Sequence, residues 1–338
     1  MTTFRARYGS LVSMRRSLLL PLLLLLAACS TAGDTLPEDG SAAAIDPVRV
    51  ASGPDQETIL LSHVMAELFE AAGIPAELVA FSDARQARQA LERGAVDARI
   101  GYTGESWLES LGRPDPPGEP RESFVTVRDH DDALGIVWFR PRFVEGIDAP
   151  PANATFAFVV PGPPSIDADL RTMSQLASRL SEQPDALVCV DREFGSRDDG
   201  LRAVLAAYSV RSDRRFVAAD PEEAVLGVVA GDCLAGLTTA TDGAAWHAGL
   251  RPLVDDLRVF PAFLPLPQVR AEAIEDDPAI RAAIGPMPAQ LTTELVGTWN
   301  ARVLAGEPVE DVARDAALVL LQRAGRSAEV LGSSVEGS

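Results

Sequence analysis

The stretch Gly94-Ala-Val-Asp-Ala-Arg-Ile-Gly-Tyr-Thr-Gly104 decides the fold. Residues 84–93 before it have helical spacing of apolar side chains, and Gly94 provides the stop signal for that helix. Apolar residues then lead to Tyr102, which predicts a short buried strand over residues 96–102. A helix that ends at a glycine and runs directly into a buried strand is typical of an α/β protein.

The same order of elements occurs upstream. An apolar run at residues 48–51 predicts a first strand, and residues 56–72 place leucine, valine and methionine on one helical face before Gly73. A second strand is expected at residues 76–81. Because strand, helix and strand follow one another twice, this part of the chain predicts a parallel sheet.

A second set of strands and helices follows a proline-rich loop. Two extended apolar segments, 134–139 and 155–160, come first. The set continues with expected helices at 173–180, 199–208 and 221–230 and expected strands at 187–191, 215–219 and 233–237. Amphipathic helices at 291–304 and 309–324 should pack back on the first lobe. The chain is long enough for two hydrophobic cores, so we expect two lobes.

The N-terminal segment has the parts of a lipoprotein export signal. Four arginines precede an apolar run, residues 18–28, which ends in small residues immediately before Cys29. As a helix, this run is too short to cross a hydrocarbon layer of about 30 Å, so a transmembrane anchor is the weaker alternative. We therefore expect a signal peptide at 1–28, acylation of Cys29 and a flexible tether at 29–45.

The charge of the chain argues against nucleic acid as a partner. The net charge is −19, and removal of the four leader arginines lowers it to −23. After the leader, the sequence has no run of lysine and arginine that could follow a phosphate backbone. A positively charged small solute is compatible with this charge.

Sequence signatures of catalysis and of metal binding are missing. The chain contains no Gly-x-Ser-x-Gly elbow, no phosphate-binding Gly-Lys-Ser/Thr loop and no His-Glu-x-x-His pair. Its histidines, His63, His130 and His247, have no ligand spacing relative to one another or to the cysteines. The sequence therefore predicts a protein that is not an enzyme and has no metal site and no cofactor.

Two cysteines, Cys189 and Cys233, follow the leader. Each lies in an apolar segment that is typical of a short buried strand. Thiols of exported proteins meet oxidising conditions, which favours a disulfide if these strands are neighbours and the Cα atoms come within about 7 Å. Two buried free thiols are the alternative.

Several motifs follow one another in a characteristic order between residues 48 and 322. They are Ala51-Ser52 with Glu57 and Ala71-Ala72-Gly73, Gly94 to Gly104 with Tyr102-Thr103-Gly104, Asn153-Ala154-Thr155-Phe156-Ala157, Glu193-Phe194 with Arg197 and Asp199-Gly200-Leu201, Thr241-Asp242-Gly243, and Phe260-Pro261-Ala262-Phe263. Together they resemble the substrate-binding proteins of ABC importers for glycine betaine, choline and carnitine. The cysteine pair also fits many members of that family.

The resemblance implies an α/β protein with the type II periplasmic-binding fold. Two lobes, each with a mainly parallel sheet, would be joined by chain crossings near residues 155–158 and 237–243, and a ligand would close the cleft between them. The expected lobe 1 comprises 46–155 and 240–325, the expected lobe 2 comprises 156–239, and 326–338 is expected to be a tail.

The family holds a quaternary ammonium group in an aromatic box by cation–π attraction. Carried over motif by motif, the rings of this box would be Tyr102, Phe156 and Phe263. Thr239 stands where the family has a fourth ring. The resemblance therefore implies a ligand site that has lost one wall of its box.

The side of the site that would hold a ligand carboxylate departs further from the family. Gly53 stands where the family has a lysine, Glu105 stands where it has a threonine, and Arg197 is kept. A lost cation and a gained acid favour a cation without a carboxylate, such as choline, over glycine betaine. Pairing of Glu105 with Arg197, or its exposure to water, is the alternative.

The functional expectation is an extracytoplasmic lipoprotein, anchored by lipid on the outer face of the cell membrane. As a monomer it would bind a quaternary ammonium osmoprotectant and deliver it to an ABC permease and its ATPase. A solute sensor, a binding protein for a different small cation, and a structural envelope lipoprotein with a degenerate cleft are the alternatives.

Overall fold

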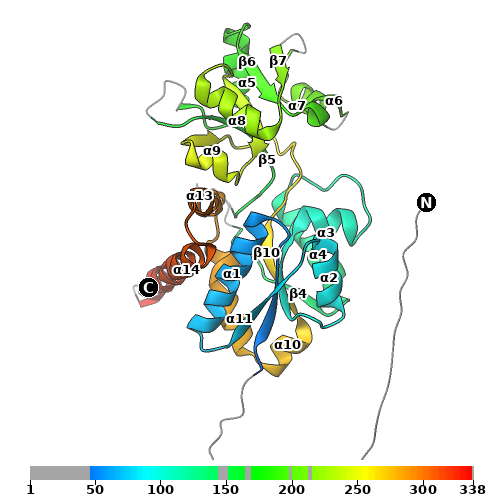
Figure 1. Cartoon of the computed structure of the whole chain (residues 1–338), viewed down its shortest axis with the longest axis vertical. Coiled ribbons are helices and arrows are strands. Elements are labelled where there is room, and N and C mark those ends of the chain that lie inside the picture. The colour runs from blue at the N-terminus through cyan, green and yellow to red at the C-terminus, as the bar shows by residue number, and fades with distance from the viewer. Residues whose placement is uncertain (1–45, 144–150, 164–168, 198–199, 212–214, 337–338) are drawn as a thin grey trace, which may run out of the picture. The chain divides into compact units, whose positions relative to one another are not determined.

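A computed structural model describes residues 46–143, 151–163, 169–197, 200–211 and 215–336 of the chain (Figure 1). The expected signal peptide at 1–28, the acylated Cys29 and the tether at 29–45 lie outside these residues. The chain from Ile45 to Ser338 forms one compact unit. In the described ranges, no helix has both the length and the apolar character that crossing a membrane requires.

The first sheet has five strands in the order β2-β1-β3-β10-β4. Their bounds are β1 (Val48–Ser52), β2 (Ala76–Ala80), β3 (Ala98–Tyr102), β4 (Ile136–Trp138) and β10 (Pro265–Arg270). β1 is parallel to β2 and β3, whereas β10 is antiparallel to both β3 and β4. The sheet is therefore mixed, with β10 as its reversed strand.

The second sheet has five strands in the order β7-β6-β8-β5-β9. Their bounds are β5 (Phe156–Pro161), β6 (Leu187–Val190), β7 (Arg215–Ala218), β8 (Ala235–Thr239) and β9 (Leu250–Pro252). β6 is parallel to β7 and β8, and β5 is antiparallel to β8 and β9. The two sheets thus share one plan, in which a single reversed strand lies next to an edge strand.

Each reversed strand directly follows a passage of the chain between the sheets. The outgoing passage leads from β4 to β5, and the return passage leads from β9 to β10. Because β9 belongs to the second sheet, the return passage covers residues 253–264. The expected lobe boundary at residues 239 and 240 and the expected return crossing at 237–243 are therefore wrong. The sequence hid β9 because it is a short edge strand that ends in a proline.

Most helices begin with the capping chemistry that the sequence provides. The helices are α1 (Gln56–Ala71), α2 (Ala84–Glu92), α3 (Thr103–Glu109), α4 (Pro120–Asp132), α5 (Met173–Glu182), α6 (Arg192–Ser196), α7 (Leu201–Ala207), α8 (Pro221–Ala230), α9 (Gly243–His247), α10 (Ala271–Asp276), α11 (Ala279–Ile284), α12 (Pro286–Gln290), α13 (Thr293–Leu304) and α14 (Val309–Glu336). Asp55 caps α1, and Asp220 forms a capping box with Glu223 at α8. Since α14 continues to Glu336 without a proline, the expected tail at 326–338 is helical to that residue.

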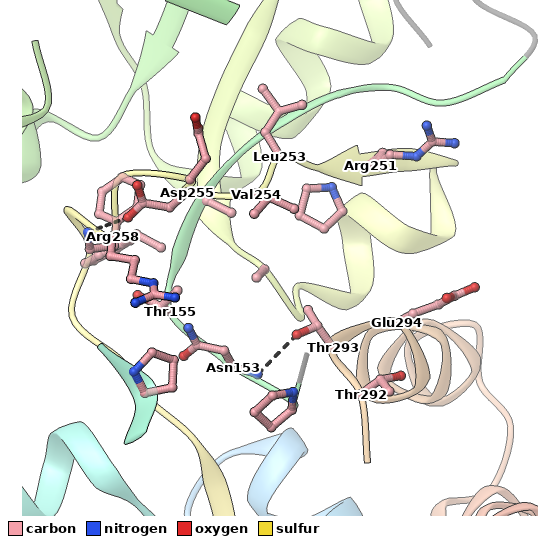
Figure 2. Close-up of a pocket in the computed structure, with 18 of the residues that line it drawn as sticks. Asn153, Thr155, Arg251, Leu253, Val254, Asp255, Arg258, Thr292, Thr293 and Glu294 are labelled. Atoms are coloured by element: carbon pink, nitrogen blue, oxygen red, sulfur yellow. Dashed lines mark hydrogen bonds between the residues drawn. The ribbon is translucent and has the colours of Figure 1, made fainter. Parts of the chain in front are cut away.

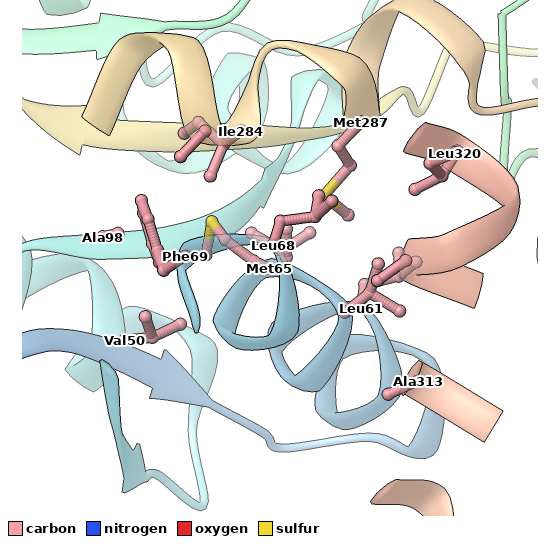
Figure 3. Packing of buried hydrophobic residues seen from close by; sticks show 14 of the residues in the cluster. Val50, Leu61, Met65, Leu68, Phe69, Ala98, Ile284, Met287, Ala313 and Leu320 are labelled. Carbon is pink, nitrogen blue, oxygen red and sulfur yellow. The ribbon is translucent and has the colours of Figure 1, made fainter. Parts of the chain in front are cut away.

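The core of the first lobe is built around α1. Leu61, Met65 and Phe69 of this helix are fully buried. Figure 3 shows these side chains between the strands and the helices of the C-terminal part, where Ile284 and Leu320 join the same cluster. Burial of one such side chain contributes about 1.5–3 kcal/mol to stability. The C-terminal helices thus complete the first lobe, as their amphipathic patterns predict.

The core of the second lobe contains a disulfide. Cys189 of β6 and Cys233, which precedes β8, are bonded, with their Cα atoms 5.9 Å apart. β6 and β8 are neighbours in the sheet, so the bond joins adjacent strands. A Cβ at Gly227 of α8 would lie 3.1 Å from the Cys189 sulfur, so the glycine leaves room for the bond.

Candidate functional site

Tyr102 ends β3 and caps the N-terminus of α3 with its backbone. Its hydroxyl donates a hydrogen bond to Oε1 of Glu57 over 2.8 Å, and the residue as a whole is partly buried. Burial, together with the charges of Glu57 and Asp55, raises the pKa of the Tyr102 phenol well above its usual value. The phenol is therefore a fixed, neutral donor that orients the ring.

Glu57 lies in the first turn of α1, and the sequence analysis did not place it in the site. Its Oε2 accepts a hydrogen bond of 2.8 Å from the Asn300 side chain of α13. Burial raises the pKa of the Glu57 carboxyl above its ordinary value, whereas hydrogen bonds from Thr241, Tyr102 and Asn300 lower it. Its place in the Ala51-Ser52 motif was the one available signal for this residue.

Phe263 lies near the end of β3 on the first lobe. β10 starts two residues after Phe263, and its Pro265 is in register with Tyr102. A Cβ at Gly104 would lie 2.5 Å from the Phe263 ring, so this glycine of the Tyr-Thr-Gly motif allows the ring to lie against α3. The Phe263 ring therefore lies against the helix that begins directly after Tyr102.

Hydrogen bonds also tie Phe263 to the outgoing passage. Its backbone N–H donates to Oδ1 of Asn153 over 2.8 Å, and its carbonyl accepts from the N–H of Ala154 over 2.9 Å. Thr155 then donates its hydroxyl to the carbonyl of Pro261 over 2.6 Å. The two passages between the sheets are thus bonded to each other just before Phe156.

Phe156 and Thr239 are paired in register on β5 and β8. The Phe156 side chain is 38% exposed, and its ring centroid lies 5.5 Å from that of Phe194 and 6.1 Å from that of Phe260. Phe194 and Phe260 are both buried. The sequence analysis named these two rings in motifs but did not assign them to the site. They support the exposed ring from beneath.

Glu105 and Arg197 are the remaining predicted site residues. The Glu105 carboxylate lies 3.0 Å from the guanidinium of Arg99, which is buried and also donates to the carbonyls of Ile100 and Ala84. The acid is therefore compensated by a cation of its own lobe. Arg197 follows α6 in the second lobe as its C-terminal cap.

Gly53 has a backbone angle φ of +102°, and a Cβ there would collide with the carbonyl oxygen of Phe81. A residue with a side chain is strained in this conformation. The local backbone of this chain therefore requires a glycine at residue 53.

A broad groove with a volume of about 1850 Å³ lies along the outgoing passage (Figure 2). Asn153, Thr155 and Phe156 line it, together with the return passage and the start of α13. The N–H of Asn153 donates to the hydroxyl of Thr293 over 3.1 Å, and Arg258 forms an ion pair with Glu119. Of the six predicted ligand residues, only Phe156 is among the described residues that line this groove.

Comparison with known proteins identifies the family. Residues 46–317 match the sequence model of the substrate-binding domain of the ABC-type glycine betaine transport system. The chain is 27% identical over 266 residues to a glycine-betaine-binding protein of Pseudomonas aeruginosa. This match covers 76% of this chain and 82% of the relative. It is 26% identical over 282 residues to the glycine betaine-binding protein YehZ of Escherichia coli, which covers 80% of this chain and 90% of the relative.

Solved structures support the fold. Apo YehZ from Escherichia coli matches with a TM-score of 0.73 and 24% identity, over 82% of this chain and 98% of that one. A glycine betaine/carnitine/choline ABC transporter protein matches with a TM-score of 0.69 and 18% identity, over 79% and 96%. These matches confirm the two-lobed periplasmic-binding fold, and the family consists of transport proteins rather than enzymes. The chain therefore belongs to the family of substrate-binding domains of ABC-type glycine betaine transport systems.

Proposed function

We propose that this protein is an extracytoplasmic lipoprotein that binds a quaternary ammonium solute between its lobes and delivers it to an ABC permease. The names of the relatives from Pseudomonas aeruginosa and Escherichia coli support glycine betaine as a member of this solute class. The leader that ends before Cys29 supports export and lipid anchoring. Binding would favour the closed form of the lobes, which the permease reads.

The observation that carries this proposal is the exposed ring of Phe156. A large aromatic side chain is 38% exposed while it packs, in tilted geometry, against two buried phenylalanines. Such a ring offers its face to a cation at a contribution of about 0.5–2 kcal/mol. Together with Tyr102 and Phe263, it provides the aromatic surfaces for a trimethylammonium group.

We further propose that a cation without a carboxylate, such as choline, is preferred over glycine betaine. Gly53 supports this preference because its backbone leaves no room for a basic side chain. The polar end of the ligand would contact Thr239, which is in register with Phe156, and Arg197, which follows α6. Glu105 contributes little to the preference, because Arg99 compensates its charge.

Titration calorimetry on the protein from Ser30 onwards tests the proposal. Choline, glycine betaine, carnitine, proline betaine and polyamines are compared, first with the unchanged protein and then with Phe156→Ala. We expect binding of quaternary amines, tightest for choline, and its loss in Phe156→Ala. Leu226→Ala is the matched control, because Leu226 is 58% exposed on α8. Absence of heat with every quaternary amine would refute the ligand assignment.

Lipid anchoring requires a separate experiment. Cys29→Ser in the full chain removes the residue that would be acylated. We expect the unchanged chain to be recovered with membranes and the variant to be released from them. Equal membrane recovery of both chains would contradict the anchor while leaving the ligand assignment untouched.

A further inference from the structure

Glu57 is a partly buried residue whose carboxylate accepts hydrogen bonds from neutral groups. Tyr102 donates to Oε1 and Asn300 donates to Oε2, each over 2.8 Å, and Thr241 also contributes a side-chain hydrogen bond. The charge closest in sequence, Asp55, has the same sign. A buried carboxylate with only neutral donors is costly, and a nearby cation would offset part of that cost.

The hydrogen bonds that reach Glu57 favour its ionised form. The side-chain nitrogen of Asn300 also donates to the carbonyl of Thr241 over 2.9 Å. A carbonyl can only accept, so it fixes the orientation of the amide, and Oε2 of Glu57 must be an acceptor. The Oδ1 of Asn300 has no partner within the described residues, which agrees with an amide turned toward two acceptors.

The other oxygen of Glu57 is also an acceptor. The hydroxyl of Thr58 donates to the carboxylate of Asp55 over 2.8 Å and lies 3.5 Å from the hydroxyl of Tyr102. The single proton of the Tyr102 hydroxyl therefore goes to Glu57, which is the nearer partner. Hydrogen bonds from Tyr102 and Asn300 at its two oxygens stabilise the ionised form of Glu57 against the cost of burial.

We propose that Glu57 is a specificity-determining residue, whose negative charge acts through the Tyr102 hydroxyl to strengthen the attraction of that ring for a cation. This inference rests on the proposed function. A phenol that donates to a carboxylate becomes more electron-rich, since charge-assisted hydrogen bonds polarise their donors. Cation–π attraction is electrostatic, so the same ring binds a cation more tightly and a neutral group no better.

The test compares a charged ligand with a neutral one of the same shape. Choline and 3,3-dimethylbutan-1-ol differ in carrying nitrogen or carbon at the centre of the trimethyl group. Dissociation constants for both are measured on the protein from Ser30 onwards, by calorimetry and by ligand-observed NMR where binding is weak. Glu57→Gln removes the charge, and Glu310→Gln, on an exposed turn of α14, is the matched control.

We expect Glu57→Gln to weaken choline binding by about tenfold or more while the neutral alcohol binds as before. The control should leave both constants unchanged. Equal weakening of both ligands would show a merely structural role and overturn the inference, as would no change in either. If Glu57→Gln does not fold, Tyr102→Phe keeps the ring and removes the hydrogen bond, and the same selective loss for choline is expected.

These outcomes are separate from failure of the proposed function. If the unchanged protein binds no quaternary amine, the proposed function itself is refuted. If the unchanged protein binds choline but neither variant alters the preference for choline over the neutral alcohol, the ligand assignment stands and the role of Glu57 is refuted.

Discussion

The guanidinium of Arg99 lies 3.0 Å from the Glu105 carboxylate, and the Arg99 side chain is only 4% exposed. Glu105→Gln would leave this buried cation without its counter-charge, so we expect a loss of about 1–3 kcal/mol in the free energy of unfolding. The ratio of the dissociation constants for choline and glycine betaine should stay the same. Urea unfolding and calorimetry measure the two quantities.

The control for this prediction is Glu109→Gln. Glu109 pairs with Arg85 on the surface, and such a pair contributes less than about 1 kcal/mol. A large change in ligand preference in Glu105→Gln, without a loss of stability, would show that Glu105 faces the ligand instead.

A second prediction concerns Gly53. Gly53→Ala adds a Cβ that collides with the Phe81 carbonyl, in addition to the strain of a positive φ. Gly73 also has a positive φ, but a Cβ there meets nothing within 4 Å, so Gly73→Ala measures the strain alone. We expect Gly53→Ala to destabilise the protein by more than the roughly 1–2 kcal/mol of Gly73→Ala. Equal losses in urea unfolding would contradict the collision.

The same geometry bears on the family's lysine. Gly53→Lys should lower stability without increasing the affinity for glycine betaine, because the backbone cannot place the new side chain without shifting. Calorimetry of the variant checks this. A gain in glycine betaine affinity would mean that the segment can rearrange around a lysine.

The third prediction concerns the disulfide. Cys189 and Cys233 are 44 residues apart in sequence, and a cross-link of this length contributes about 2–4 kcal/mol to stability. Reduction should therefore lower the urea midpoint of the unchanged protein. The double variant Cys189→Ala with Cys233→Ala serves as the control, and its midpoint should not respond to the reductant.

The fourth prediction concerns Asp131, which is fully buried on α4. Burial alone would raise its pKa, but hydrogen bonds and charge from Arg88, with hydrogen bonds from His130 and Trp138, bring the pKa below its ordinary value. Because the folded pKa is the lower one, this stabilisation is complete above the pKa of the unfolded chain, near 3.9, and is lost as the pH falls through the folded pKa. Urea unfolding below pH 4 should show the loss.

Asp131→Asn tests the same network at neutral pH. The substitution leaves the buried Arg88 without its two-point partner, so we expect a loss of about 3–5 kcal/mol in the free energy of unfolding. Asp129→Asn is the control: Asp129 lies two residues earlier on α4, is exposed, and its substitution should change stability little. If the steep loss of stability at acid pH persists in Asp131→Asn, other carboxylates cause that loss.

The sequence predicted the strands β1 to β8 and the helices α1, α2, α5, α7, α8 and α13 to within about two residues, because their signals are local, but it did not predict several shorter helices or α4. α1 and α2 end at Gly73 and Gly94, which both have positive φ, as their stop signals indicate. β10 was missed because Pro265 and Pro267 disfavour a strand, yet it pairs on both sides. The direction of β5 and β10 depends on pairing between distant segments, which no local pattern encodes.

For the site, the motifs predicted which residues lie near one another on each lobe. Phe156 and Thr239 are neighbours because strand register pairs them, and the Phe263 ring lies against Gly104, two residues after Tyr102. The partner of Glu105 could not be read from the sequence, since Arg99 was one of many arginines and its burial depends on packing. Glu57 was missed for the same reason, because its role arises from Asn300, which lies 243 residues later.

The place of β10 in the first sheet has a consequence for how the chain acquires its structure. The strands of the second sheet come from one continuous segment, whereas β10 lies between β3 and β4 in the first. When the chain becomes available from the N-terminus first, it can therefore complete the second sheet while the first sheet still lacks its inner strand β10. β10 and the helices after it should then close the first lobe last.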